Sequence, residues 1–300
     1  MKGAAVILMD YLLPRDVIRA VDKHRITGLA GVPPLWNQLC KLDWPDSARE
    51  TLRYITNSGG AMPTATLASL RERLPNTRPY LMYGLTEAFR STFLPPEELD
   101  RRPTSMGKAI PNAEIMVVRE DGTACAPGEP GELVHRGALV SLGYWNDPER
   151  TKVRFRPVPG QLEGKVLQEF AVWSGDTVKM DEDGFLYLIG REGDRIKRSG
   201  YRVSPTEIEE VVYTSGLVSE VAALGVPHPE LGQAIVLVAV ALPDGASDDE
   251  PVLSHCRAQL PNFMAPSRIL WREKLPRNPN GKIDRKTLTS EPEGMFGEAE

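Results

Sequence analysis

Short apolar runs alternate with helix-spaced apolar residues from Ala4 to Tyr83. The runs AAVILM, ITGLAG, LRYITNSG and RPYLMYG are typical of buried strands. The helical patterns between them are carried by Val17, Ile18 and Val21, by Leu35, Leu39 and Leu42, and by Leu67, Leu70 and Leu74. This βαβα order predicts a parallel sheet covered by helices, with ligands gathering at the carboxyl ends of its strands.

The hydrophobic pattern changes after Glu87, where Pro and Gly punctuate shorter apolar runs. The segments AEIMVV, GELVHR and FLYLIG are typical of strands, and REDG and DEDG are typical of the turns between them. We therefore predict an antiparallel, barrel-like subdomain in this part of the chain.

A self-contained α+β pattern begins beyond Gly193. It contains a hairpin, a helix from Pro205, β-rich runs at residues 218–226 and 234–242, and a helix near residues 249–260. The predicted fold class is therefore α/β plus α+β. Residues 1–192 are expected to form a large domain, residues 193–290 a small domain, and residues 291–300 a flexible tail.

Composition narrows the range of functions. With 300 residues, 41% of them hydrophobic, and a net charge of -5, the chain has no excess positive charge for nucleic acid or an anionic membrane. No apolar stretch approaches the roughly 20 residues that span a bilayer. The three cysteines and four histidines lack the spacing of a disulfide framework or a zinc site. A cytoplasmic protein is the simplest expectation.

Four short segments carry residues suited to binding a nucleotide. In YGLTE, Thr86 is suited to a phosphate and Glu87 to Mg²⁺, although such residues also open helices. Gly59 and Gly60 let the backbone approach a flat ligand or simply form a turn. Asp176 in WSGD is suited to two ribose hydroxyls or to an Asx turn. Lys282, after NPNG, offers a cation on an exposed turn.

These segments resemble the adenylate-forming acyl-CoA synthetases, because YGLTE, WSGD, the hinge LIGREGDRIKRSGYRVSPTEIEE and PRNPNGKIDR stand in that family's order. The resemblance implies ATP/AMP, Mg²⁺ and coenzyme A as ligands, and an AMP-forming acyl-CoA ligase of the EC 6.2.1 type. It also implies roles for individual residues. The implied nucleotide-binding residues are Gly59, Gly60, Ala61, Tyr83, Gly84, Thr86, Asp176 and Arg191, and Glu87 is the implied metal ligand.

The remaining implied roles concern the small domain. Lys282 would reach the substrate carboxylate and the α-phosphate, which makes it catalytic together with Thr86 and Glu87. After adenylation the small domain of family members turns, so that Lys197, the fourth implied catalytic residue, would face the site and Gly200 would line the thiol tunnel. Basic residues beside Gly200, namely Arg195, Arg198 and Arg202, are a hypothetical contact for the phosphates of CoA.

The chain departs from the family in two ways. Gly193 stands where the hinge normally has Asp or Lys, followed by Asp194, and this permits a less sharply confined rotation. The upstream phosphate-binding loop and acyl-pocket motif of the family are also absent, so the chain looks N-terminally truncated. We therefore expect exposed apolar surface, and either an N-terminal partner segment or self-association.

The sequence leaves several functions open. The first is an ATP-dependent acid:thiol ligase that activates a fatty or other carboxylic acid and passes it to CoA, which is favoured by the absence of a carrier-protein serine motif after KIDRKTL. The second is an adenylation domain that loads a separate carrier protein. The third is a catalytically incompetent fragment, or half of a split ligase. The phrase GYRVSPTEIEEVV is most similar to the exosortase-associated acyl-CoA ligases.

Overall fold

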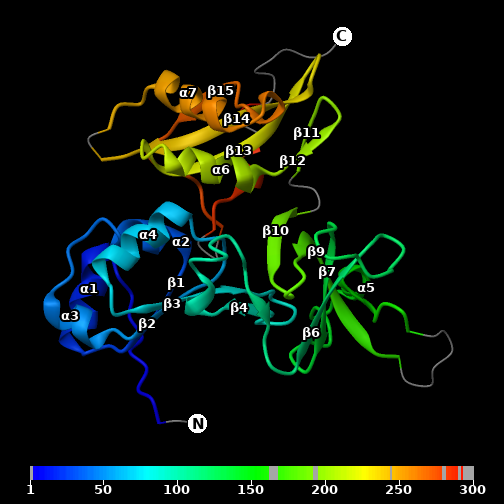
Figure 1. Ribbon diagram of the computed structural model, residues 1–300, viewed down its shortest axis with the longest axis horizontal. Helices are drawn as coiled ribbons and strands as arrows, with labels where there is room; N and C mark the ends of the chain where they lie inside the picture. Colours follow the sequence, from blue (N-terminus) through cyan, green and yellow to red (C-terminus); the bar gives the residue numbers. More distant parts are fainter. Residues whose placement is uncertain are drawn as a thin grey trace.

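The computed structural model describes residues 3–161, 168–191, 195–243, 245–278, 282–289 and 292, with Arg202 described by its backbone alone. Within these residues the strands form three sheets of five strands each. Figure 1 shows the third sheet in a separate lobe beside the first two. The arrangement confirms the predicted fold class: a sheet covered by helices, a curled antiparallel sheet and a small α+β lobe.

The first sheet has the order β1-β2-β3-β4-β5 and is mixed. β1, β2 and β3 are parallel, whereas β4 and β5 are antiparallel to their neighbours. The short connection between β3 and β4 explains the reversal, because a parallel pair needs a crossover of about a dozen residues or more. The strands are β1 (Gly28–Gly31), β2 (Tyr54–Asn57), β3 (Arg78–Tyr83), β4 (Thr92–Leu94) and β5 (Lys108–Ala109).

Helices cover this sheet largely as the apolar spacing predicts. Val17, Ile18 and Val21 are buried, and so are the leucines at positions 67, 70 and 74. Trp36 completes this core and is fully shielded from solvent. The helices are α1 (Pro14–Lys23), α2 (Pro33–Leu39), α3 (Asp46–Thr51), α4 (Thr64–Arg73) and the short 3-10 helix η1 (Pro96–Glu98).

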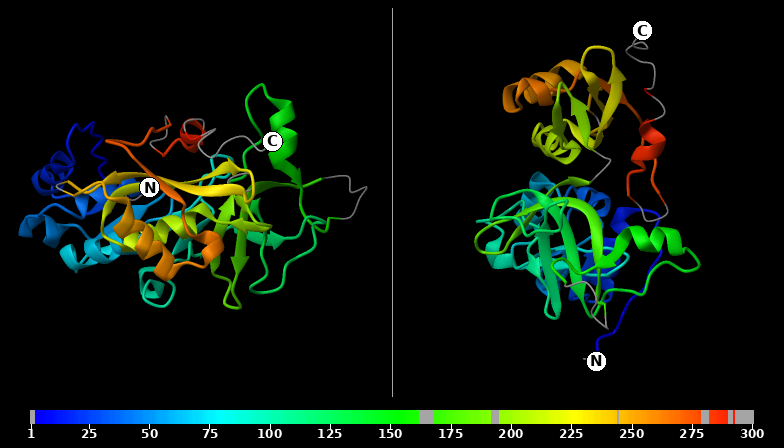
Figure 2. Two further views of the ribbon diagram at one scale, coloured as in Figure 1. Left: turned by 90° about the horizontal axis from the view of Figure 1, so that it is seen from above. Right: turned by 90° about the vertical axis from the view of Figure 1, so that its right-hand side faces the viewer.

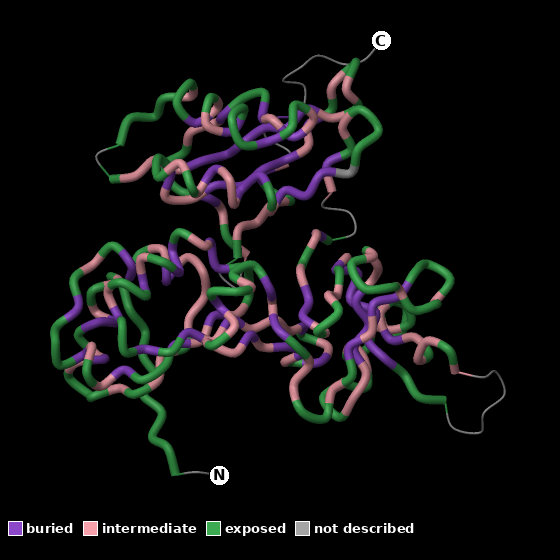
Figure 3. Tube along the Cα trace, viewed as in Figure 1, coloured by how far each residue is buried: buried purple, intermediate pink, exposed green. Residues whose placement is uncertain are grey.

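The strand expected over AAVILM is not formed. Residues 3–11 have no regular secondary structure, and Val6, Leu8 and Leu12 are 85%, 94% and 95% exposed. Figure 3 shows this segment running away from the body of the protein as a continuous exposed tube. Its apolar residues are typical of a strand, but no described strand pairs with it, so the backbone hydrogen bonds of a strand cannot form.

The second sheet confirms the predicted antiparallel subdomain. Its order is β10-β9-β7-β6, with β8 also paired to β9. All of its described pairings are antiparallel. The elements are β6 (Ala113–Val118), β7 (Gly131–Gly137), α5 (Pro148–Arg154), β8 (Phe155–Pro157), β9 (Phe170–Met180) and β10 (Leu186–Arg191).

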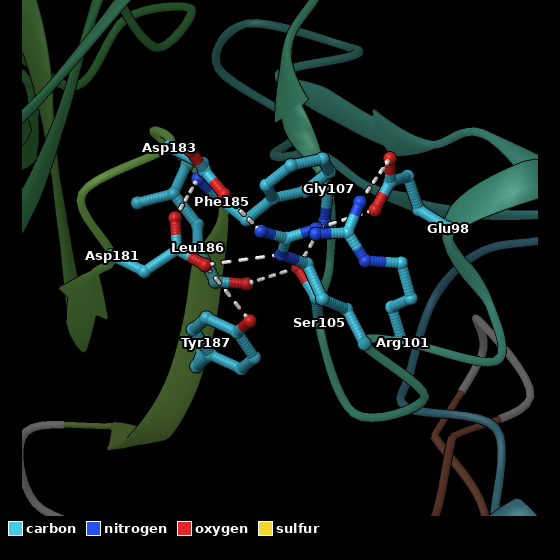
Figure 4. Close-up of polar contacts among 10 residues, drawn as sticks. Glu98, Arg101, Ser105, Gly107, Asp181, Asp183, Phe185, Leu186 and Tyr187 are labelled. Carbon is cyan, nitrogen blue, oxygen red and sulfur yellow. Dashed lines mark hydrogen bonds and ion pairs between the residues drawn. The ribbon is translucent and has the colours of Figure 1, made fainter.

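A polar network joins the segment after η1 to the turn between β9 and β10 (Figure 4). Ser105 Oγ donates to the carbonyl oxygen of Leu186 over 2.9 Å. The carboxylate of Asp181 accepts hydrogen bonds from Arg102 Nε at 3.2 Å and from the Tyr187 hydroxyl at 3.0 Å. The contacts of Ser105 and Arg102 thus link the second sheet to the segment between β4 and β5 of the first.

The third sheet belongs to the small lobe and has the order β12-β11-β14-β13, with β15 parallel to β14. Figure 2 shows this lobe from two further directions, with its helices packed against the sheet. Ile208 and Val212 from α6 pack with Ile235 of β14 and Cys256 of α7 in its core. The elements are β11 (Ile196–Arg198), β12 (Tyr201–Val203), α6 (Pro205–Thr214), β13 (Val218–His228), β14 (Gly232–Ala241), α7 (Asp249–Gln259), η2 (Asn262–Met264), β15 (Arg268–Trp271) and α8 (Arg285–Thr289).

Candidate functional site

A glycine loop follows β2 at the carboxyl end of the first sheet. Asn57, the last residue of β2, is buried, and its Nδ2 donates to the carbonyl oxygen of Gly60 over 2.9 Å. Gly59 has a φ of 86°, a left-handed conformation that glycine adopts without steric cost. Gly59, Gly60 and Ala61 are all exposed, so the backbone of this loop is open to a ligand.

Tyr83 ends the neighbouring strand β3 and leads a chain of polar contacts. Its hydroxyl donates to Asp176 Oδ2 over 2.5 Å, and Arg191 Nε donates to Asp176 Oδ1 over 2.8 Å. Asp176 lies within β9, directly opposite Arg191 of β10, so its carboxylate makes contacts across strands instead of closing a local Asx turn. Because β2 and β3 are parallel neighbours, this triad lies at the same sheet end as the glycine loop.

Electrostatics within this triad follow from its geometry. The Tyr83 phenol is shielded from water and faces the negative charge of Asp176, and both effects raise its pKa well above the usual value. Tyr83 therefore stays protonated and acts as a hydrogen-bond donor to Asp176. The guanidinium of Arg191 supplies the opposite charge to a carboxylate that is only 6% exposed.

Residues 85–88 form a turn, and no helix opens at Thr86 or Glu87. Gly84 is required sterically, because a Cβ there would lie 2.1 Å from the carbonyl oxygen of Phe89. Thr86 is exposed and Glu87 is half-buried. Glu87 Oε1 accepts a hydrogen bond from the hydroxyl of Tyr144, a contact that no local sequence pattern indicates.

Tyr144 orients the Glu87 carboxylate from the loop before α5. Its ring packs edge-on against Phe155 with the centroids 5.7 Å apart, and its backbone nitrogen donates to Thr151 Oγ1 over 2.9 Å. Shielding from water and the neighbouring Glu87 raise the pKa of Tyr144 to about 12. The tyrosine in GYWND is visible in the sequence, but nothing local links it to Glu87.

Lys282 reaches this site from the small lobe. Its Cε lies 3.6 Å from the position that a Cβ on Gly59 would occupy. In Figure 1 the segment after β15 descends from the small lobe towards the first sheet. The backbone at Lys282 is held by Asn278, whose Oδ1 accepts from Lys282 N over 3.1 Å. The preceding residues of the PNGK motif, 279–281, lie outside the described residues.

Lys197 and Gly200 lie apart from this site, on the β11–β12 hairpin. Ser199 and Gly200 both have positive φ values, 48° and 83°, as the two central residues of a type I′ turn require. Both Lys197 and Gly200 are exposed, and a Cβ on Gly200 would meet no atom within 4 Å. In the neighbouring basic cluster, Arg198 donates to the carbonyl oxygen of Ala265 over 2.6 Å.

The predicted hinge is described only at its edges. β10 ends at Arg191 and β11 begins at Ile196. Gly193 and Asp194, on which the expected freedom of rotation depends, lie outside the described residues. The side chain of Arg202 does so as well.

The residues at the turn fit a magnesium ion that is shared with a nucleotide. Mg²⁺ is usually held by one or two carboxylates together with phosphates and water, and Glu87 supplies one carboxylate. In the part of the chain that the structure describes, no group of three or more His, Cys, Asp or Glu residues is placed to hold a metal. Among the same residues, no helix has the length and apolar character to cross a membrane.

Comparison with known proteins shows two family models that match this chain. Residues 1–145 match the family model of the AMP-binding enzymes, and residues 207–282 match that of the AMP-binding enzyme C-terminal domain. A long-chain-fatty-acid–CoA ligase of Salmonella typhimurium is 34% identical over 289 residues. That match covers 94% of this chain and 48% of the relative, so the chain spans about half the length of such relatives.

Solved structures agree with this assignment. MatB from Rhodopseudomonas palustris, bound to ATP, superimposes with a TM-score of 0.81 at 26% identity, covering 95% of this chain and 54% of that protein. The o-succinylbenzoate CoA synthetase of Bacillus subtilis, in complex with ATP and magnesium, gives a TM-score of 0.76 at 25% identity, covering 92% and 54%. The chain belongs to the AMP-binding, adenylate-forming acyl-CoA ligase family.

Proposed function

We propose that this chain is the later portion of an ATP-dependent acid:thiol ligase. In the proposed reaction the carboxylate of an acid attacks the α-phosphorus of ATP, pyrophosphate leaves, and an acyl-adenylate forms. The sulfur of CoA then attacks the acyl carbon, the thiol loses its proton, and AMP leaves. We assign residues 1–192 to the nucleotide-binding body and residues 193–290 to the small domain.

The position of Lys282 beside Gly59 carries this proposal. A cation from the small lobe meets the glycine loop at the same sheet end as the Tyr83, Asp176 and Arg191 triad. We assign the adenine to the 59–61 backbone and Tyr83, and the ribose hydroxyls to Asp176 and Arg191. With these assignments, we propose that the α-phosphate lies between the ribose site and Lys282.

Each remaining residue then has a definable task in the first step. The Lys282 ammonium stabilises the negative charge that builds as the carboxylate attacks phosphorus. Thr86 donates to a phosphate oxygen from its exposed turn beside Gly84. Glu87, oriented by Tyr144, would hold Mg²⁺, which offsets phosphate charge when it is bound.

The second step involves the β11–β12 hairpin. Lys197 and Gly200 lie away from Gly59 while Lys282 is beside it, so they are assigned to a different placement of the small lobe. We propose that this placement brings Gly200 to the path of the CoA thiol. Transfer to CoA, as opposed to a carrier protein, is supported by the CoA ligases among the relatives.

Acid-dependent exchange of labelled pyrophosphate into ATP tests the first step. We expect exchange to require a carboxylic acid, and to rise when the N-terminal half of a relative is supplied. Exchange that does not depend on added acid would contradict the proposal. Supplying CoA or a purified carrier protein, and detecting the thioester formed, separates the two possible acceptors.

A catalytically incomplete half of a ligase is the second candidate, and the exposed N-terminal segment favours it. Val6, Leu8 and Leu12 present apolar surface that a partner polypeptide or a second copy would cover. Strong exchange by the chain alone would exclude this candidate. The substrate is proposed only as a carboxylic acid, the cytoplasm is the proposed location, and the exosortase-associated subgroup stays a prediction from the GYRVSPTEIEEVV phrase.

A further inference from the structure

The small lobe contacts the segment between β2 and α4 at two points. At the start of the segment, Lys282 Cε lies 3.6 Å from the position of a Cβ on Gly59. At its end, Glu210 of α6 accepts a hydrogen bond from the backbone nitrogen of Thr64 over 2.8 Å and a second from the Thr64 hydroxyl. The loop 59–63, which presents the glycine backbone, is therefore bracketed by two residues of the other lobe.

Glu210 supplies the capping acceptor that α4 lacks in its own sequence. The N-cap of α4 is Pro63, which makes no side-chain capping bond, and the first turn of the helix contains no acidic residue. Unpaired N–H groups at a helix start favour a carboxylate, both as an acceptor and as a negative charge. Here that carboxylate comes from a residue 146 positions away in the sequence.

Glu210 and Lys282 are connected through the interior of the small lobe. Glu209, the neighbour of Glu210, accepts two hydrogen bonds from Arg285, at 2.6 and 2.8 Å. Arg285 begins α8, three residues after Lys282. Glu209 also accepts from Ala223 N over 2.7 Å, which ties the same carboxylate to β13. Anchoring Glu210 on α4 therefore restricts where Lys282 can lie.

We propose that Glu210 is a positioning residue, which docks the small lobe on the N-terminus of α4 and so holds Lys282 beside Gly59. The inference rests on the proposed function only for the consequence that acyl-adenylate formation needs this arrangement. The docking contact itself does not depend on that function, because it follows from the geometry of the two lobes. Glu207 lies on the exposed side of the same helix and is not part of the proposed contact.

The distance between the lobes tests the docking without any activity. Spin labels are attached to cysteines introduced at two exposed positions, Ala68→Cys on α4 and Ala258→Cys on α7. Cys125→Ser removes the cysteine that is partly exposed, and the other two, Cys40 and Cys256, are buried. We expect one narrow distance distribution, broadened by Glu210→Ala and unchanged by the matched control Glu207→Ala. Glu210→Gln keeps an amide oxygen that accepts from Thr64, so the width of its distance distribution should lie between those of the parent protein and Glu210→Ala. A folded Glu210→Gln variant also shows that the fold tolerates a change at this position.

Kinetics give the second readout. In labelled-pyrophosphate exchange, Glu210→Ala should lower kcat by about tenfold, the value of a charge-assisted hydrogen bond, with little change in the KM for ATP. An unchanged distance distribution in Glu210→Ala, or an equal broadening in Glu207→Ala, would overturn the proposal. If the parent protein shows no acid-dependent exchange even when the N-terminal half of a relative is supplied, the proposed function fails, while the distances still decide the role of Glu210.

Discussion

The hydroxyl of Tyr83 donates to Asp176 Oδ2 over 2.5 Å and so links the last residue of β3 to the middle of β9. Asp176 is buried and is held from its other side by Arg191. A carboxylate fixed between two donors is preorganised to accept further hydrogen bonds from a pair of adjacent hydroxyls.

Replacing Asp176 by Asn should therefore weaken ATP binding. We expect the Kd for ATP to rise about tenfold or more, because charge-assisted hydrogen bonds to the ribose are lost. Isothermal titration calorimetry measures the effect, and Asp10→Asn, on the exposed N-terminal segment, serves as the control. Equal affinity for ATP and for 2′,3′-dideoxy-ATP in the parent protein would contradict the ribose assignment.

Lys282→Ala should slow adenylation without harming the fold. The side chain is exposed, so its loss should change the free energy of unfolding by less than about 0.5 kcal/mol. Loss of a fixed cation at the developing charge should lower pyrophosphate exchange by roughly a hundredfold to a thousandfold. Lys286→Ala, on the exposed surface of α8, is the matched control. Similar exchange rates in the two variants would remove Lys282 from the mechanism.

The raised pKa of Tyr144, from 10.0 to about 12, makes a prediction for alkaline pH. Between these values the unfolded chain loses the phenolic proton while the folded chain keeps it. The contribution of Tyr144 to the free energy of unfolding is therefore fully present below pH 10 and is lost as the pH rises from 10 through 12. Tyr144→Phe should remove this part of the loss. Urea unfolding at pH 8 and pH 11.5 measures it, with Tyr11→Phe as the control. A pH dependence unchanged in Tyr144→Phe would show that burial and Glu87 do not keep this phenol protonated in the folded protein.

The exposed apolar segment predicts association. Val6, Leu8 and Leu12 lie outside any packed core, and water-exposed apolar surface favours contact with a second polypeptide. Sedimentation velocity should show concentration-dependent self-association, which Val6→Lys with Leu8→Lys reduces. Val153→Lys, a change at a 65% exposed position on α5, should not reduce it. A monodisperse monomer at all concentrations would contradict the prediction.

Local patterns predicted the fold well where burial and periodicity coincide. Val17, Ile18 and Val21 share a helix face, and their spacing alone shows which side of α1 meets the sheet. The same reasoning failed for AAVILM, because an apolar run indicates a strand only if another strand is available to pair with it. Pairing is a property of the whole sheet and cannot be read from the run itself.

The site was predictable as a set of motifs but not as a set of contacts. Asp176 and Arg191 stand opposite each other because β9 and β10 form a hairpin, a relationship that turn signals make accessible. By contrast, Glu87 and Tyr144 are 57 residues apart, and Thr64 and Glu210 are 146 apart. Such pairs depend on how separate sheets and lobes pack, and no local composition encodes them.

Two glycines allow the cost of backbone strain to be measured separately from the effect of covering the proposed adenine surface. Gly59 and Gly128 have similar positive φ values, 86° and 80°, so an added methyl group should destabilise the fold by about 1–2 kcal/mol at either position. Around Gly128 a Cβ would meet nothing within 4 Å, whereas at Gly59 it would lie 3.5 Å from Val32 and 3.6 Å from Lys282. Both distances are ordinary contacts, so the methyl group fits, but it covers the backbone surface assigned to adenine.

Gly59→Ala and Gly128→Ala should therefore match in stability and differ in ligand binding. The melting temperature is expected to fall by a similar amount in both variants. The affinity for ATP should fall only in Gly59→Ala, by about tenfold if the stacked adenine loses contact worth 1–2 kcal/mol. Equal ATP affinities in the two variants would mean that the adenine does not lie on the 59–61 backbone, and would move the nucleotide site away from the end of β2.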